Sequence, residues 1–334
     1  MTHAPRFLHV ANGTSTTMSI EASGIDGMVS IWADPLYEGP VPGGISDEAL
    51  IDVRASFLAN PDDPVSTDPV NDLRQWRDVI DASDAYDELV LWYEHDLFDQ
   101  LNLVQLLSYV RAHVAAGTPV SLVCIGSFPG RPQFKGLGEL PPEVFPGLFA
   151  QRERIGDAQF VAGEQAWDAF RAPSPLPVDA LQRAGTPALP FLASALRRLL
   201  EEYPAAGDGL SRSERRLLQL TALEPAELAG VFPSMHDDER AYYITDTSLA
   251  ALARALASTS PPILSFVREG SPDRPLAAVV TPTDAGRAVL EHRLDRVACG
   301  LDRWLGGVHL RTGGDVWRWD AAGARMTQDA ARLR

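Results

Sequence analysis

The sequence is poor in cysteine and lysine, and it lacks a long apolar run. Its 334 residues include two cysteines and a single lysine, Lys135. Two thiols in a chain of this size are not a disulfide framework, which excludes the class of small disulfide-rich secreted proteins. No apolar run approaches the roughly 18 residues that span a bilayer, and the first residues lack the pattern of a signal peptide. We therefore expect a cytoplasmic protein without a membrane partner.

Basic residues are also fewer than acidic ones, and the excess of negative charge is unevenly distributed along the chain. The formal net charge is −16. Residues 207–334 hold 16 arginines against 17 acidic residues, a net of −1, which leaves −15 for residues 1–206. An acidic surface of this kind repels polyanions at long range. The composition argues against nucleic acid as a partner and suits a metal site, a cationic ligand or a solvated surface.

Apolar runs alternate with helix-like segments through residues 1–140. Strands are predicted at residues 6–10, 28–32, 88–93 and 119–125, and helices at 46–58, 72–80 and 101–114. A Pro/Asp-rich loop is predicted at 60–69. Strands alternating with helices imply βαβ units. The predicted fold class is α/β, with a Rossmann-like parallel sheet in residues 1–140.

The pattern changes after residue 140. Residues 141–205 read as a helical extension that packs on the first domain. Residues 206–334 then show helices near 211–221, 224–231 and 247–257, strands at 263–267 and 277–280, and a last helix over 283–297. This is the order of a winged-helix module. The tail is rich in aromatic residues, from Trp304 to Trp319, which we expect to pack in a core or to contact a second copy of the chain.

Polar residues follow each predicted strand. The carboxyl ends of parallel strands meet at one edge of a sheet, where ligands bind. We therefore predict a site at that edge. Its members, in strand order, are Asn12, Gly13, Thr14 and Ser15; Asp34 and Glu38; Glu94, His95, Asp96, Asp99 and Gln100; and Ser127 and Lys135.

These residue types suggest specific roles. We predict catalytic roles for His95, Asp96, Glu94 and Asp34, since carboxylates hold hard metals such as Mg²⁺ or Mn²⁺ and histidine titrates near neutral pH. The three carboxylates are the predicted metal ligands. The first turn after Gly13 could expose backbone N–H groups to a phosphate. The remaining strand-end residues are predicted to contact substrate: Asn12, Gly13, Thr14, Ser15, Glu38, Asp99, Gln100, Ser127 and Lys135.

Each assignment has a purely structural alternative. The Asn12–Ser15 segment is equally a βα turn with a helix cap, and it lacks the glycine patterns of the P-loop and of dinucleotide-binding folds. Asp34 and Glu38 could shape a Pro/Gly loop. Residues 94–96 could form a solvated loop in which Asp96 or Asp99 caps the next helix. Lys135 could be a surface lysine.

Several strings resemble a bacterial family filed as domain of unknown function 1835. They are Leu8-His-Val-Ala-Asn-Gly13, Trp32-Ala-Asp-Pro-Leu-Tyr-Glu-Gly-Pro-Val-Pro42, Leu91-Trp-Tyr-Glu-His-Asp-Leu-Phe-Asp-Gln-Leu101, Cys124-Ile-Gly126, Gly209-Leu-Ser-Arg-Ser-Glu-Arg-Arg216 and Trp304-Leu-Gly-Gly-Val-His309. The resemblance covers most of the chain and implies the same two-part layout. In that family an acidic residue often occupies the position of Thr14, so this chain departs from it there. The resemblance implies no reaction.

Two classes of function fit the sequence. The first is an enzyme, a hydrolase or transferase, that acts on a phosphorylated or nucleotide-like small molecule with a divalent metal. The second is a ligand-responsive regulator or interaction module with a winged-helix-like C-terminal domain. The candidate recognition helix over 247–257 carries only Arg254, whereas DNA-reading helices present several basic or amide side chains. The sequence therefore favours the enzyme.

Overall fold

A computed structural model describes residues 5–59, 68–314 and 316–328, which form a mixed α/β structure. Its central sheet has the order β2-β1-β4-β5-β6, and all but the last strand are parallel. These strands are β1 (Phe7–Ala11), β2 (Met28–Ile31), β4 (Glu88–Glu94), β5 (Val120–Ile125) and the short β6 (Glu153–Arg154). The four predicted strands and their parallel arrangement are confirmed.

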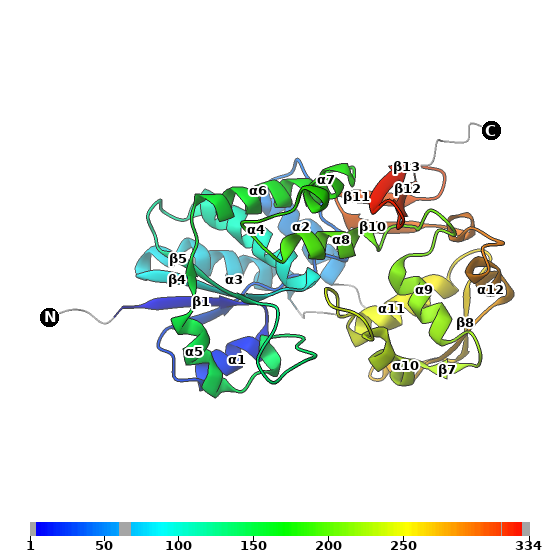
Figure 1. The fold of residues 1–334 in the computed structure, drawn as a ribbon, viewed down its shortest axis with the longest axis horizontal. Helices are drawn as coiled ribbons and strands as arrows, with labels where there is room; N and C mark the ends of the chain where they lie inside the picture. Colours follow the sequence, from blue (N-terminus) through cyan, green and yellow to red (C-terminus); the bar gives the residue numbers. More distant parts are fainter. Residues whose placement is uncertain (1–4, 60–67, 315, 329–334) are drawn as a thin grey trace.

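Helices cover both faces of this sheet (Figure 1). One face carries α1 (Thr14–Ala22) and α5 (Phe145–Ala150), and the other carries α4 (Leu97–His113) and α6 (Asp157–Arg171). Alternate residues of β4 point to the two sides: Leu91 belongs to the larger core and Trp92 to the smaller one. A strand buried on both faces needs apolar side chains throughout, which explains why this strand was predictable.

Four more helices complete residues 1–205. They are α2 (Asp47–Leu58), α3 (Pro69–Asp81), α7 (Leu176–Ala184) and α8 (Leu192–Leu200). The loop predicted over 60–69 falls largely outside the described residues. Short 3₁₀ turns occur at η1 (Ser83–Ala85), η2 (Leu137–Glu139), η3 (Pro142–Val144), η4 (Pro275–Ala277) and η5 (Arg296–Cys299).

Residues 212–290 form a helical unit with a small antiparallel sheet of order β7-β9-β8. Both predicted helices of this region are present, but one boundary of each was wrong. The helix predicted near 224–231 is preceded by a strand, because residues 226 and 227 pair with β9. The helix predicted over 283–297 ends early, because His292 has a φ of 58°, which a right-handed helix does not tolerate. The elements are α9 (Arg212–Leu220), β7 (Ala226–Glu227), α10 (Leu228–Met235), α11 (Asp246–Ala257), β8 (Leu264–Arg268), β9 (Val279–Pro282) and α12 (Asp284–Leu290).

The aromatic tail returns to the N-terminal region. Strand β10 (Asp302–Gly306) pairs with β11 (Val308–Arg311) and, in parallel, with β3 (Gly39–Pro40). A second hairpin joins β12 (Trp317–Asp320) to β13 (Arg325–Gln328), and Trp319 is buried in the main core. Core packing of the tail is thus confirmed, while the boundaries at residues 140 and 205 stay predictions. Within the described residues, no helix has the length and apolar character required to cross a membrane.

Candidate functional site

The site lies where the strand order of the central sheet reverses direction. Strand β2 lies on one side of β1, whereas β4 and β5 follow on the other. In an open α/β sheet, a reversal of this kind opens a crevice at the carboxyl ends of the two central strands. Asn12 directly follows β1, and Glu94 is the last residue of β4. The strand-end residues predicted for these two strands therefore meet at this crevice.

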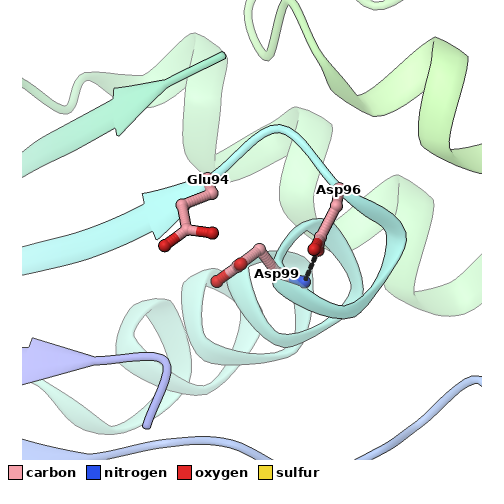
Figure 2. Close-up of side chains that lie close together, drawn as sticks. All are labelled: Glu94, Asp96 and Asp99. Atoms are coloured by element: carbon pink, nitrogen blue, oxygen red, sulfur yellow. Dashed lines mark hydrogen bonds between the residues drawn. The ribbon is translucent and has the colours of Figure 1, made fainter. Parts of the chain in front are cut away.

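Three acidic side chains, Glu94, Asp96 and Asp99, form what we call the carboxylate cluster (Figure 2). They come from the end of β4, the following loop and the first turn of α4. Each contributes an oxygen atom that lies within 4.8 Å of the others. The exposed fractions of Glu94 and Asp99 are only 4% and 1%. The sequence thus predicted the members of this cluster, although it assigned Asp99 to substrate rather than to metal.

Asp96 also caps the helix that follows. Its Oδ1 accepts a hydrogen bond of 2.9 Å from the backbone N–H of Asp99, which makes it the N-cap residue of α4. The helix cap considered as part of the structural alternative is therefore confirmed for Asp96, whereas the solvated loop is not, because Glu94, Asp96 and Asp99 are buried. The cap turns the chain sharply after β4, and the turn brings Asp99 back beside Glu94. Helix capping and the clustering of carboxylates are two results of one local conformation.

The carboxylate cluster has no compensating positive charge. Among the described residues, no arginine, lysine or histidine forms an ion pair with any of its three members. Its hydrogen-bond donors are neutral: Asn12 Nδ2 donates to Glu94 Oε1 (3.1 Å) and Asp99 Oδ2 (3.0 Å), and the Leu137 backbone N–H donates to Glu94. Asp99 Oδ1 and Asn12 Oδ1 are buried without any hydrogen-bond partner. Buried oxygens of this kind are costly unless a cation or a donor meets them.

Burial raises the pKa of all three groups. Burial raises the pKa of Glu94 to about 8, and the Asp96 charge adds to this. Burial also raises the pKa of Asp96 to about 6. The pKa of Asp99 lies well above its usual value because of burial and the charges of Glu94 and Asp96. Without a cation the cluster therefore holds protons near neutral pH, and a bound divalent cation would displace them.

The glycine-rich loop that follows β5 lies against the carboxylate cluster and against helix α1. A Cβ at Gly136 would collide with the Glu94 carboxylate. A Cβ at Gly138 would lie 2.9 Å from the Cβ of Ser15. Both contacts are tighter than ordinary van der Waals packing, so only glycine lets the loop approach this closely. The loop that begins after β5 thus belongs to the site.

The first turn of α1 lies next to the cluster through Asn12. Gly13 is the N-cap residue, with a φ of 155°, and no side chain caps the helix. Thr14 and Ser15 are exposed. A helix N-terminus without a side-chain cap leaves backbone N–H groups available to an anion. The predicted phosphate-binding residues and the carboxylate cluster are therefore neighbours.

His95 occupies an aromatic environment instead of joining the carboxylates. Its ring centroid lies 6.1 Å from that of Phe134 and 6.2 Å from those of Phe191 and Tyr243. Burial lowers the pKa of His95, which favours the neutral imidazole. Its Nδ1 is buried without a hydrogen-bond partner. Successive residues of an extended segment point to opposite sides, which accounts for the different direction of His95.

Asp34 is not brought into the cluster. Arg54 donates to both of its carboxylate oxygens, with Nε at 3.1 and 2.9 Å and Nη2 at 2.6 Å from Oδ1. Both residues are almost fully buried. Asp34 follows β2, and β1 separates that strand from β4. Asp34, one of the three carboxylates predicted to bind a metal, is thus held in an ion pair instead. The third member of the carboxylate cluster, beside Glu94 and Asp96, is Asp99.

The remaining predicted residues are dispersed around the site. Gln100 Nε2 donates to the backbone oxygen of Glu94 (2.6 Å) and fixes the end of β4. Ser127 is exposed at the end of β5. Lys135 places its Nζ 6.0 Å from the centroid of the Tyr243 ring. Glu38 lines a separate cavity formed with α11 and β10.

Sequence reasoning missed the contribution of the segment between α10 and α11. The backbone oxygen of Ala241 accepts a hydrogen bond of 2.6 Å from the N–H of Leu97, the first residue of α4. Tyr243 contacts His95, and burial together with the Asp96 charge raises the pKa of its phenol to about 12. These residues are far from the cluster in sequence, and no motif marks them.

The sequence was compared with protein-family models and with curated proteins. No protein-family model matches the chain, and no curated protein sequence matches it. The resemblance to domain of unknown function 1835 therefore stays a prediction.

Proposed function

We propose that this chain is an enzyme that binds a divalent cation in the carboxylate cluster and acts on a phosphorylated or nucleotide-like small molecule, as a hydrolase or a transferase. One observation carries the proposal: three buried carboxylates converge without a positive charge, and Asp99 Oδ1 and Asn12 Oδ1 lack any partner. Oxygen ligands in this number and chemistry suit Mg²⁺ or Mn²⁺. Glu94, Asp96 and Asp99 are the proposed ligands, and the amide oxygen of Asn12 lies beside them.

The position of α1 supports a phosphate-bearing substrate. Its N-terminus has no side-chain cap and follows directly after Asn12, which contacts two members of the cluster. A phosphate at Thr14 and Ser15 would accept hydrogen bonds from backbone N–H groups on one side and would contact the cation on the other. Negative charge that develops during phosphoryl transfer would then be neutralised from both sides.

His95 stays the proposed proton carrier on its acidity alone, because its ring packs against Phe134, Phe191 and Tyr243 and does not join the carboxylates. Its imidazole is neutral at physiological pH because burial lowers its pKa, and Nδ1 is unpartnered. A neutral imidazole nitrogen can accept a proton from a substrate hydroxyl or from water. We expect His95→Gln to bind substrate but to turn it over far more slowly.

A thermal-shift screen tests the proposal. Wild type is heated with nucleotides and sugar phosphates, each with Mg²⁺, with Mn²⁺ and with EDTA. A ligand at about 100 times its Kd adds roughly 2.7 kcal/mol of stability, and the stabilisation should require the cation. If no phosphorylated compound shifts the midpoint in the presence of either cation, the proposal is refuted.

A second candidate function rests on the order of elements in residues 212–282. A helix, a short strand, two helices and a two-stranded hairpin follow one another, and the three strands form one antiparallel sheet. This order resembles a winged-helix module. Together with a Rossmann-like first domain, it would suit a ligand-responsive regulator. A salt-dependent gel shift with genomic fragments would favour this candidate, whereas the single arginine of α11, Arg254, favours the enzyme.

The family assignment is also a proposal. We infer that the chain belongs with domain of unknown function 1835 because the strings at residues 8–13, 32–42 and 91–101 coincide with β1, the segment after β2, and the β4–α4 turn. The last of these holds the carboxylate cluster. The test is structural: a member of that family should hold the same three carboxylates at the same turn.

A further inference from the structure

Residues 239–243, which lie between α10 and α11, contact the turn that carries the carboxylate cluster. We call this segment the strap. The backbone oxygen of Ala241 accepts a hydrogen bond of 2.6 Å from the N–H of Leu97, and the centroid of the Tyr243 ring lies 6.2 Å from that of His95. The strap belongs to the helical unit of residues 212–290, whereas the turn follows a strand of the central sheet. Two remote parts of the chain therefore meet at the candidate site.

The contact with Leu97 completes the start of α4. The first backbone N–H groups of a helix have no partner within the helix. Asp96 accepts from two of them, through its side chain from Asp99 and through its backbone oxygen from Gln100. The N–H of Leu97 instead donates to the strap, and Leu97 is fully buried. Because a buried N–H without a partner is costly, the strap helps to fix the position at which α4 begins.

Arg198 of α8 holds the strap at two points. Its Nε donates to Glu239 Oε2 at 2.8 Å, and its guanidinium carbon lies 4.8 Å from the centroid of the Tyr242 ring. Glu239 Oε1 in turn accepts a hydrogen bond of 3.2 Å from the backbone N–H of Ala241. A planar guanidinium that binds a carboxylate and stacks on a ring leaves little freedom to either. The side chain of Arg198 therefore sets the position of the strap backbone.

Arg198 is the buried anchor of the strap. It is almost fully buried, and its Nη1 and Nη2 donate to Glu202 (2.6 Å) and to Ser213 (3.2 Å). Arg212 also approaches Glu239, but at 3.5 Å and with an exposed side chain. Exposed ion pairs contribute little to stability, whereas breaking a buried pair leaves a charge without compensation. The contact of the strap with Arg198 is therefore the stronger of the two.

We propose that Arg198 is a positioning residue of the candidate site. Its guanidinium holds the strap, and the strap holds the start of α4 and covers one side of the His95 ring. The helical unit of residues 212–290 is then a part of the site and not a separate module. This inference goes beyond the proposed function, since it depends only on the geometry of the strap. Release of the strap would uncover His95 without unfolding the central sheet.

A matched pair of variants at Leu97 tests the strap. Leu97→Pro removes the N–H that donates to Ala241, and proline is favoured at the first position of a helix. The preceding residue, Asp96, has φ −80° and ψ 173°, which suits the residue before a proline. Leu97→Ala is the control, because it loses the side chain and keeps the N–H. The measurement is the rate at which diethyl pyrocarbonate modifies His95, followed by peptide mass spectrometry and divided by the rate at His113.

His113 is a suitable reference because it is exposed at the other end of α4. We expect the ratio of the His95 rate to the His113 rate to be about two- to tenfold higher in Leu97→Pro than in Leu97→Ala, the factor by which the loss of one hydrogen bond raises the population of an open state. A general loss of stability would raise both rates and would leave this ratio unchanged. Equal ratios in the two variants would overturn the role of the strap.

Two further variants test the anchor. Arg198→Met and Glu239→Ala should each raise the same ratio above that of wild type. Arg198→Met leaves two buried carboxylates without their partner and is the less stable of the two, whereas Glu239→Ala leaves Arg198 paired with Glu202. If Arg198→Met fails to fold, Glu239→Ala decides: a ratio equal to that of wild type contradicts the proposal. The measurement needs neither cation nor substrate, so its outcome is independent of the proposed function.

Discussion

At the scale of single residues, the molecule contains two kinds of buried carboxylate. Asp34 is neutralised by Arg54, whereas Glu94 and Asp99 face each other with neutral donors only. Buried charges without a partner cost stability, and residues that break a local rule tend to mark functional sites. The same residue type therefore serves folding at one strand end and, in our proposal, function at another.

This contrast predicts opposite effects of equivalent substitutions. Glu94→Gln and Asp99→Asn replace a carboxyl group that is buried without a positive partner by a neutral amide of nearly the same shape, so the free energy of unfolding should stay unchanged or rise, while any response to Mn²⁺ is lost. Asp34→Asn, the matched control, leaves Arg54 buried without its counter-charge and should cost about 3–5 kcal/mol. Urea denaturation of the three variants provides the comparison. A large loss of stability in both cluster variants would mean that those carboxylates serve the fold.

Two substitutions of Asp96 separate its role as the cap of α4 from its proposed role as a metal ligand. Asparagine caps helices about as well as aspartate, so Asp96→Asn should keep the stability of α4. Asp96→Ala removes the acceptor for the Asp99 N–H and should cost about 0.5–2 kcal/mol. Both variants should lose cation binding. Unfolding curves and Mn²⁺ titrations of the pair check this, and intact cation binding in Asp96→Asn would remove Asp96 from the ligand set.

At the scale of secondary-structure elements, the start of α1 is the proposed phosphate-binding position. Thr14→Asp places a carboxylate in a first turn that contains no acidic residue. This carboxylate interacts favourably with the helix dipole, which should raise the free energy of unfolding by about 0.3–1 kcal/mol. The same carboxylate occupies the proposed phosphate position. We expect this variant to remain folded and to lose binding of ADP in the presence of Mg²⁺. Thr14→Ala is the control, since it keeps the backbone N–H groups and should retain most of the affinity.

How far each element could be predicted follows from its burial. Strand β4 is covered on both faces, so its apolar run was a clear signal. The segment at Ala226 and Glu227 is too short for any periodic pattern, and its pairing with β9 comes from tertiary structure alone. The C-terminal end of α12 was missed because the backbone of His292 has a positive φ, which histidine adopts rarely enough to escape a sequence-based prediction.

The candidate site, too, could be predicted from the sequence only in part. The sequence predicts polar residues at the ends of parallel strands, and Asn12, Glu94 and Asp99 do lie together. It does not reveal that Asp34 pairs with Arg54, because that contact depends on how α2 packs. The contact between Ala241 and Leu97 joins distant segments through a backbone carbonyl, which carries no sequence signature.

At the scale of the whole molecule, the carboxylate cluster should make stability depend on pH. Groups whose pKa is raised by folding stabilise the protein below their unfolded values and lose that contribution as the pH rises through their folded values. The folded pKa values of Glu94 and Asp96 are raised to about 8 and about 6, against unfolded values near 4. In EDTA, the free energy of unfolding should therefore fall as the pH rises from about 4 to about 8, by up to about 1.4 kcal/mol per pH unit for each proton involved.

Saturating Mn²⁺ should offset this loss, with its largest effect above pH 7, where it competes with the fewest protons. Urea denaturation across this pH range, with and without the cation, gives both curves. Glu94→Gln should flatten the curve measured in EDTA. A wild-type curve that rises with pH in EDTA would show that the buried carboxylates are ionised and compensated.

Isothermal titration calorimetry of the wild-type protein with Mn²⁺, at pH 7 in two buffers of different ionisation enthalpy, measures whether the carboxylate cluster binds a cation. We expect saturable binding that releases protons, because Glu94 and Asp99 must ionise to hold the cation. Glu94→Gln and Asp99→Asn should abolish the binding, while Glu153→Gln, an exposed acidic residue of β6, should behave like wild type. No saturable binding to wild type, or equal binding by the two cluster variants, would contradict the assignment of this cluster as a cation site.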